Sequence, residues 1–172
     1  MPNWCMNNLV LKNTKEKIDA LESQLRKNEG KEFFNLLFPR PLEEAENWYE
    51  WNVANWGTKW DVNIDIEYDQ MVRLNDETLE FRFDTAWSPP TGFYDFLVDD
   101  GWDVSAKYYE CGMGFIGQYE NCIDECWDYD FDNEETLNEI PDDLREWAGL
   151  DEELEWYKES NQEIEGGEDE TH

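Results

Sequence analysis

The segment from Asp61 to Asp69 alternates strictly between polar and apolar residues, and this alternation constrains the fold more than any other feature. Every even position from Val62 to Tyr68 is apolar or aromatic, and every odd position is polar. A β-strand places successive side chains on opposite faces of a sheet, so the pattern predicts a strand with one buried face. Carboxylates then line the other face in steps of about 6.6 Å, and they are Asp61, Asp65, Glu67 and Asp69.

A second alternating segment, residues 79–84, follows the turn residues 75–77 and predicts an antiparallel neighbour for the first. Further strands are predicted at residues 4–12 and 104–109, and residues 115–119 continue the last of them beyond a glycine-rich stretch.

Helical spacing appears between these strands. Ile18, Leu21 and Leu25 recur on one helical face, with Thr14 as a candidate N-cap. Residues 93–98 predict a second helix that covers the inner face of the sheet. The order strand, helix, strand, strand, helix, strand predicts an α+β fold, a ferredoxin-like βαββαβ sandwich with an antiparallel sheet.

Two regions fall outside that core. Residues 33–51 are interpreted as an insertion, extended around Pro39 and Pro41 and then forming a short acidic helix. The domain organisation expected is a ferredoxin-like domain at 1–120, an acidic, aromatic-rich helical extension at 121–157 and a disordered acidic tail at 158–172. Within the extension, one helix is expected to begin at Pro141.

The net charge of −31 is unevenly distributed along the chain. Residues 1–60 carry eight Lys/Arg against nine Asp/Glu, whereas residues 118–172 carry two against twenty-two. Such a surface repels phosphates, which argues against nucleic acid or an anionic membrane as a direct partner. Direct RNA binding would require Arg73, Arg82 and Lys107 to cluster.

Cysteine and histidine usage limits the chemistry available. The start of the chain does not look like a secretory signal and no window is long and apolar enough for a membrane span, so we expect a soluble cytoplasmic protein with four free, mostly buried cysteines. Cys122 and Cys126 are one helical turn apart, but no second close pair accompanies them, so neither a metal nor another cofactor is predicted. His172 is the only imidazole, which leaves no Ser–His or Cys–His catalysis.

The segment Asn55-Trp-Gly-Thr-Lys-Trp-Asp61 combines a flexible glycine, one lysine and two indoles. It is interpreted as a turn that anchors Trp56 and Trp60 in the core, with Lys59 paired to a neighbouring carboxylate, and the alternative is a ligand-contacting loop.

Five ordered landmarks resemble the YubB-type ferredoxin-like family of phages and plasmids, over residues 1 to about 120. They are Met1-Pro-Asn-Trp-Cys5 with Asn7, Phe38-Pro-x-Pro41, Asn55–Asp61, Thr85-Ala-Trp-Ser-Pro-Pro90, and Glu110-x-Gly112 to Gly117. The resemblance implies a ferredoxin-like fold and an origin on a mobile element of a bacterial host. It brings no catalytic residues.

These observations favour a non-enzymatic role: binding and inhibiting a host nucleic-acid-binding defence protein by DNA mimicry, through a basic surface of that partner. Candidate contact residues are the carboxylates of two segments: Asp61, Asp65, Glu67 and Asp69, then Asp124, Glu125, Asp128, Asp130 and Asp132. One alternative is a non-catalytic protein-interaction module that docks through aromatic residues, its charge serving only solubility. A second is a small carboxylate- or metal-dependent hydrolase.

Overall fold

The computed structural model describes residues 2–166 and divides the chain into two compact units, Met1–Cys126 and Trp127–His172. A six-stranded antiparallel sheet with helices makes this an α+β protein, as predicted. The strands are β1 (Trp4–Lys12), β2 (Met71–Asn75), β3 (Thr78–Ala86), β4 (Asp103–Glu110), β5 (Phe115–Glu120) and β6 (Ile123–Asp128), in the spatial order β2-β3-β1-β4-β5-β6.

Strand β1 lies at the centre of the sheet and pairs antiparallel with both β3 and β4. Its alternation works as predicted, because Cys5, Leu9 and Leu11 are fully buried while Trp4 and Met6 on the other face are about half exposed. Three predicted strands, at 4–12, 104–109 and 115–119, coincide with β1, β4 and β5 within one residue or two.

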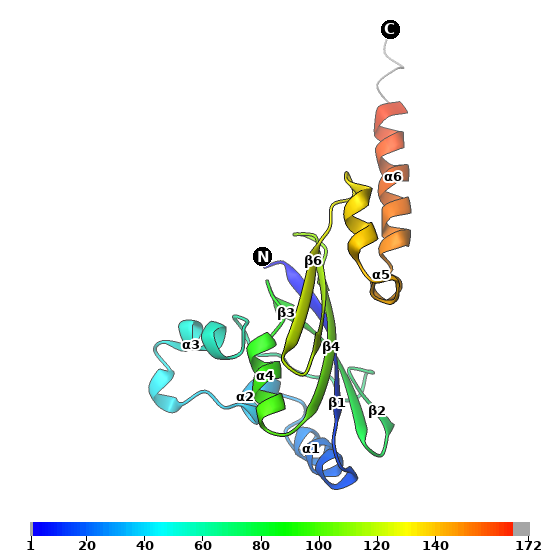
Figure 1. The fold of residues 1–172 in the computed structure, drawn as a ribbon. Coiled ribbons are helices and arrows are strands. Elements are labelled where there is room, and N and C mark those ends of the chain that lie inside the picture. The colour runs from blue at the N-terminus through cyan, green and yellow to red at the C-terminus, as the bar shows by residue number, and fades with distance from the viewer. Residues whose placement is uncertain (1, 167–172) are drawn as a thin grey trace. The chain divides into compact units, whose positions relative to one another are not determined.

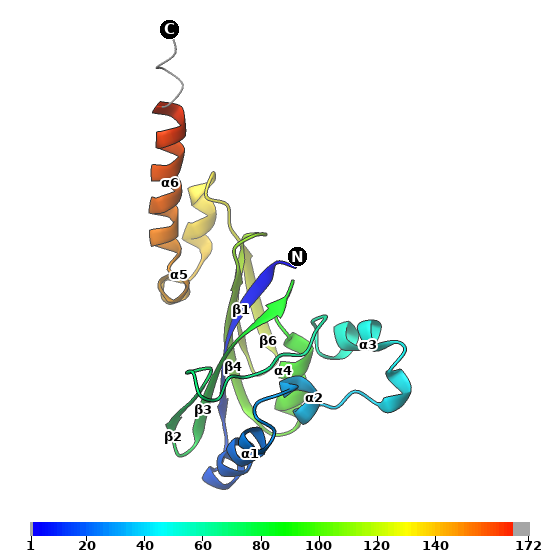
Figure 2. The same cartoon turned by 180° about the vertical axis from the view of Figure 1, so that it is seen from behind.

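Three helices cover the buried face of the sheet: α1 (Lys15–Lys27), α2 (Phe33–Leu37) and α4 (Thr91–Asp99), as Figures 1 and 2 show. The predicted stripe of α1 is buried, and Thr14 caps the helix by accepting a hydrogen bond from the Lys17 amide. Phe33 and Phe34 of α2 and Phe93 of α4 form a cluster with rings 4.6 to 5.8 Å apart.

The insertion after α1 differs from the prediction. Residues 33–37, for which no helix or strand was predicted, form α2, and the acidic helix expected at 43–51 is instead a 3-10 turn (Leu42–Glu44) followed by α3 (Trp48–Asn55). Pro41, just before the 3-10 turn, has an extended backbone, as predicted.

The second unit contains a 3-10 helix (Glu134–Glu139), α5 (Asp142–Ala148) and α6 (Leu150–Gly166). Helix α5 begins at Asp142, one residue after the predicted start, because Pro141 occupies its N-cap, and Gly149 ends the helix in a left-handed conformation, φ 68°. Two expectations are corrected: residues 123–128 form a strand rather than part of a helical extension, and α6 continues to Gly166 where disorder was expected from 158. The rest of the expected tail, residues 167–172, lies outside the described residues.

Candidate functional site

The strand predicted at residues 61–69 does not form, and Asp61 is not a surface carboxylate. Its side chain accepts hydrogen bonds from the amides of Phe34 (2.7 Å) and Asn35 (2.9 Å), at the start of α2. A third comes from the amide of Val62. Burial raises the pKa of this carboxyl, although the three amide donors act in the opposite direction. Asp61 is therefore a structural cap of α2 and is withdrawn from the candidate contacts.

The alternation after Asp61 holds only in part, since Tyr68 was expected on the buried face and is 76% exposed. Ile64 is buried while Asp65 and Glu67 are exposed, because the segment lies along the loop after α1 instead of along the sheet. The Ile64 amide donates to the Gly30 carbonyl (2.7 Å), and the Val62 carbonyl accepts from the amide of Phe33 (2.8 Å). Residues 71–75 take the place beside β3, because the tight turn at 76–77 pairs β3 with the residues directly before it.

The remaining carboxylates of this segment are exposed but make no regular row. Asp65 Oδ1 accepts from the amide of Glu67 (3.1 Å), and the Asp65 amide donates to the side chain of Gln70. These bonds close a turn in which Asp69 has a left-handed backbone, φ 55°. Three exposed carboxylates on a turn thus replace the predicted strand face.

The carboxylates of β6 point to opposite faces of the sheet. Asp124 accepts from the hydroxyl of Tyr108 (2.7 Å), whereas Glu125 accepts from the side-chain amide of Gln118 (2.8 Å). Burial, and then the hydrogen bond to Asp124, raise the pKa of Tyr108 well above its ordinary value. Both carboxylates are exposed on a strand at the edge of the sheet.

The other three predicted contacts lie just after Glu125. Asp128 is exposed at the end of β6. Asp130 organises a turn, since its carboxylate accepts from the amide of Asp132 (2.9 Å). Asp132 in turn accepts from the hydroxyl of Tyr157 on α6 (2.8 Å), and the rings of Phe131 and Tyr157 are 5.6 Å apart. The loop and the helix are thus tied together within the second unit.

The second unit carries the densest charge of the protein. Residues 127–166 hold sixteen Asp/Glu and two Lys/Arg. Both cations are used internally: Arg145 pairs with Asp151, and Lys158 pairs with Glu134 (2.7 Å). Leu137, Ile140, Leu144 and Leu150 are buried. The carboxylates of residues 127–162 therefore belong to an ordered surface rather than to an unstructured tail.

Helices α1 and α6 differ in the signs of charged residues that are four positions apart. In α1, residues four apart have opposite sign and pair, as Lys15 does with Asp19 (2.8 Å). In α6, exposed residues four apart have like sign, as in Asp151/Glu155 and Glu155/Glu159. Like pairs at this spacing destabilise a helix by roughly 0.2–0.5 kcal/mol each, so helix stability does not account for the sequence of α6.

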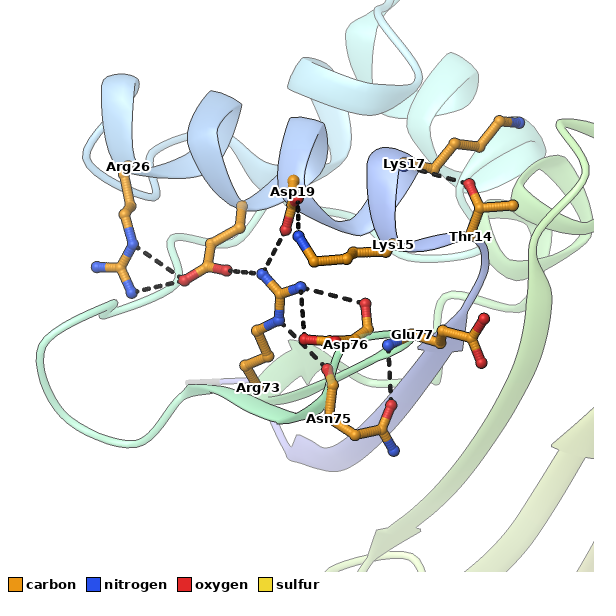
Figure 3. A network of polar contacts seen from close by, with 10 residues as sticks. Thr14, Lys15, Lys17, Asp19, Arg26, Arg73, Asn75, Asp76 and Glu77 are labelled. Atoms are coloured by element: carbon orange, nitrogen blue, oxygen red, sulfur yellow. Dashed lines mark hydrogen bonds and ion pairs between the residues drawn. The ribbon is translucent and has the colours of Figure 1, made fainter.

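The three cations considered for RNA binding do not form one cluster. Arg73 extends towards α1, where it binds the carboxylates of Asp19 (2.7 Å) and Glu22 (3.0 Å) and joins β2 to that helix (Figure 3). Arg82 and Lys107 flank Asn8 on the other face of the sheet, and Arg82 pairs with Glu80 there. The guanidinium of Arg73 is therefore used in ion pairs within the fold.

The cysteines differ from the expectation in burial. All four are free thiols, but only Cys5 is buried, whereas Cys111, Cys122 and Cys126 are exposed. Burial raises the pKa of the Cys5 thiol well above its ordinary value, which keeps it protonated. Across the part of the chain that the structure describes, no three His, Cys, Asp or Glu side chains gather in a way that could hold a metal ion.

Two of the tryptophan-containing landmarks meet in the first unit. The Thr58 hydroxyl donates to the Ala86 carbonyl (3.0 Å), and the Ser88 hydroxyl donates to the Gly57 carbonyl (2.7 Å). Trp56 is fully buried, as the turn interpretation predicts, but Trp60 is 38% exposed. Between the two loops lies an open pocket of about 230 Å³, lined by Tyr49, Val53, Gly57, Thr58, Lys59, Ala86, Trp87 and Ser88. The contributions of Tyr49 and Trp87 were not predicted: Trp87 stands in the landmark at 85–90, whereas Tyr49 lies on α3 outside every landmark.

Comparison with known proteins finds no matching family model, no matching curated protein and no matching solved structure. None of the helices in residues 2–166 has the length and apolar character needed to cross a membrane.

Proposed function

We propose that this protein binds a nucleic-acid-binding protein of a bacterial host and inhibits it by mimicking the charge of DNA. The observation that carries the proposal is the ordered acidic surface of the second unit, whose two cations are both neutralised internally. The contact surface is centred on α6, where Glu152, Glu155 and Glu159 are exposed along one side. Duplex DNA is likewise a rigid array of closely spaced negative charges, which basic channels bind.

The charge pattern of α6 favours a binding role over solubility alone. A solubilising helix can mix both signs, as α1 does, and gain stability from the pairs. In helix α6, neighbouring carboxylates repel each other, yet the helix is held to the loop by the hydrogen bond between Tyr157 and Asp132. Binding to a basic partner would neutralise these carboxylates, so the free energy that their repulsion costs the free protein would be offset in the complex.

The proposal also covers the origin and architecture of the first unit. The strand order β2-β3-β1-β4, with α1 and α4 on one face, supports a ferredoxin-like core, as the YubB-type resemblance implies. The acidic second unit would then be the specialised part of a phage- or plasmid-borne inhibitor of a defence protein. We assign it no catalytic role.

The test uses the full tagged chain to capture proteins from a bacterial lysate at about 50 mM salt, followed by elution with duplex DNA or with about 300 mM salt. We expect a nucleic-acid-binding protein that both eluents release. The triple variant Glu152→Gln, Glu155→Gln, Glu159→Gln should capture it at least about fivefold less, since each lost contact weakens an electrostatic interface.

A matched control removes the same charge elsewhere. Glu43→Gln, Glu46→Gln and Glu77→Gln change exposed carboxylates of the first unit by the same three charges and should leave capture unchanged. An equal loss of captured partner in both triple variants would mean that capture depends on net charge alone and not on the surface of α6. Capture of a partner that resists both DNA and salt would replace mimicry by the alternative, an aromatic interaction module.

A further inference from the structure

We propose that the pocket between the two tryptophan-bearing loops binds a small aromatic carboxylate, with Lys59 as the group that recognises the negative charge. This site is positively charged within a strongly acidic protein, lies wholly in the first unit and is independent of the acidic surface proposed above. Three observations support it: the state of Lys59, the chemistry of the walls and the backbone of Trp87.

Lys59 has no ionic partner among the residues that the structure describes, contrary to the pairing expected from the sequence. Although the chain has 44 Asp and Glu residues, no carboxylate among the described residues pairs with its ammonium. The ammonium lies instead 4.7 Å from the ring centroid of Trp60 and 5.7 Å from that of Tyr49. Two rings hold the charge at the pocket by cation–π attraction and leave it available to an anion.

The walls suit a flat apolar body. Tyr49, Val53 and Trp87 are each 45–49% exposed, so an aromatic ligand would cover apolar surface that now faces water. The hydroxyls of Thr58 and Ser88 are already used, because they donate to backbone carbonyls of the facing loop. Among the lining residues, Lys59 is the one that carries a charge, and it is therefore the group that would orient an anionic ligand.

The size of the pocket limits the ligand. Sites for drug-sized molecules occupy roughly 300–1,000 Å³, so a pocket of about 230 Å³ accepts one ring and its substituent. A free aromatic acid and the C-terminal aromatic residue of a peptide share this chemistry.

Trp87 has a backbone conformation that its side chain does not explain. Its φ is 73°, in the left-handed region, and its amide donates to the Asn3 carbonyl (2.9 Å). A bulky residue in such a region costs roughly 1–3 kcal/mol, whereas glycine adopts it readily. The indole is about half exposed, so packing does not repay this strain. A role of the Trp87 ring in contacting a ligand at the mouth of the pocket would account for this strained backbone.

The full chain is titrated with benzoate, and separately with benzamide as a neutral ligand of the same shape. Backbone amide chemical shifts are followed at about 150 mM salt, which screens the net charge of the protein. We expect saturable shifts at residues 57–59 and 86–88 with millimolar benzoate, and binding of benzamide about fivefold weaker. Lys59→Met, which keeps the aliphatic stem, should remove that difference. N-acetylphenylalanine and its amide form a second pair, and tighter binding of this acid than of benzoate would identify a peptide C-terminus as the source.

A second variant separates binding from folding. Trp87→Gly should weaken both benzoate and benzamide while the melting temperature stays the same or rises, because glycine relieves the strained φ. Equal binding of acid and amide, a difference that survives Lys59→Met, or the absence of saturable shifts in these loops would overturn the proposal. A fall in melting temperature of Trp87→Gly would show that the indole serves packing and would equally count against it.

Discussion

Asp61 shows how one side chain can change role between pattern and structure. By alternation it is a surface carboxylate, yet it accepts three backbone hydrogen bonds and caps α2. The carboxylate of the exposed residue Asp65 instead accepts a hydrogen bond from the amide of Glu67 across a turn. At the scale of the residue, the difference between the two lies entirely in which backbone amides are within reach.

We therefore expect Asp61→Ala to lower the free energy of unfolding by about 2–3 kcal/mol, because it removes a cap and leaves the amides of Phe34 and Asn35 without acceptors. Asp65→Ala should change it by less than about 0.5 kcal/mol. Urea unfolding of the two variants measures both values. Equal effects would mean that Asp61 is no more structural than its exposed neighbour.

At the scale of the element, Arg73 joins β2 to α1. Hydrogen bonds from Lys15 and then Arg73 hold the pKa of Asp19 below its ordinary value. The pKa of Glu22 is also lowered: partial burial opposes the shift, but hydrogen bonds from Arg26 and Arg73 outweigh it. A carboxyl whose pKa is lower in the folded state stabilises the fold above its unfolded pKa, and that contribution is lost as the pH falls through the folded pKa.

Arg73→Met should accordingly lower the melting temperature at pH 7, and the difference from the parent chain should shrink as the pH falls through the lowered pKa values of Asp19 and Glu22. Arg82→Met is the matched control, because Arg82 pairs with Glu80 two residues away in the same strand and joins no elements. Its effect should be smaller at neutral pH. A deficit of Arg73→Met that is independent of pH would assign its role to packing of the side-chain stem.

At the scale of the whole molecule, a net charge of −31 means that the folded chain repels itself, most strongly where residues 127–166 concentrate carboxylates. Salt screens this repulsion. Raising sodium chloride from about 10 to about 500 mM should therefore increase hydrogen-exchange protection of amides in α6 more than in β1. A neutral osmolyte serves as the control, since it stabilises without screening. Equal gains in both elements under salt would contradict a locally repulsive second unit.

Local patterns by themselves determined the elements whose partners lie close in the chain. The 3.6-residue stripe of Ile18, Leu21 and Leu25 with its Thr14 cap determined α1, and Leu9 and Leu11, two residues apart in the segment 4–12, indicated β1. Both patterns depend only on which side chains avoid water, and each element buries one face whatever covers it.

Only the tertiary structure decided what buries each face. Alternation in residues 61–69 predicted the burial of Ile64, but not the exposure of Tyr68 or the backbone hydrogen bonds that Asp61 accepts. The turn at 76–77 pairs residues 71–75 with β3, so the alternating segment packs along the loop after α1. The pocket is likewise formed by loops some thirty residues apart, joined by Thr58 and Ser88. Hydrogen bonds between segments distant in the sequence hold residues 62–64 against the loop after α1 and join the two loops of the pocket. The periodicity of the sequence does not encode such contacts.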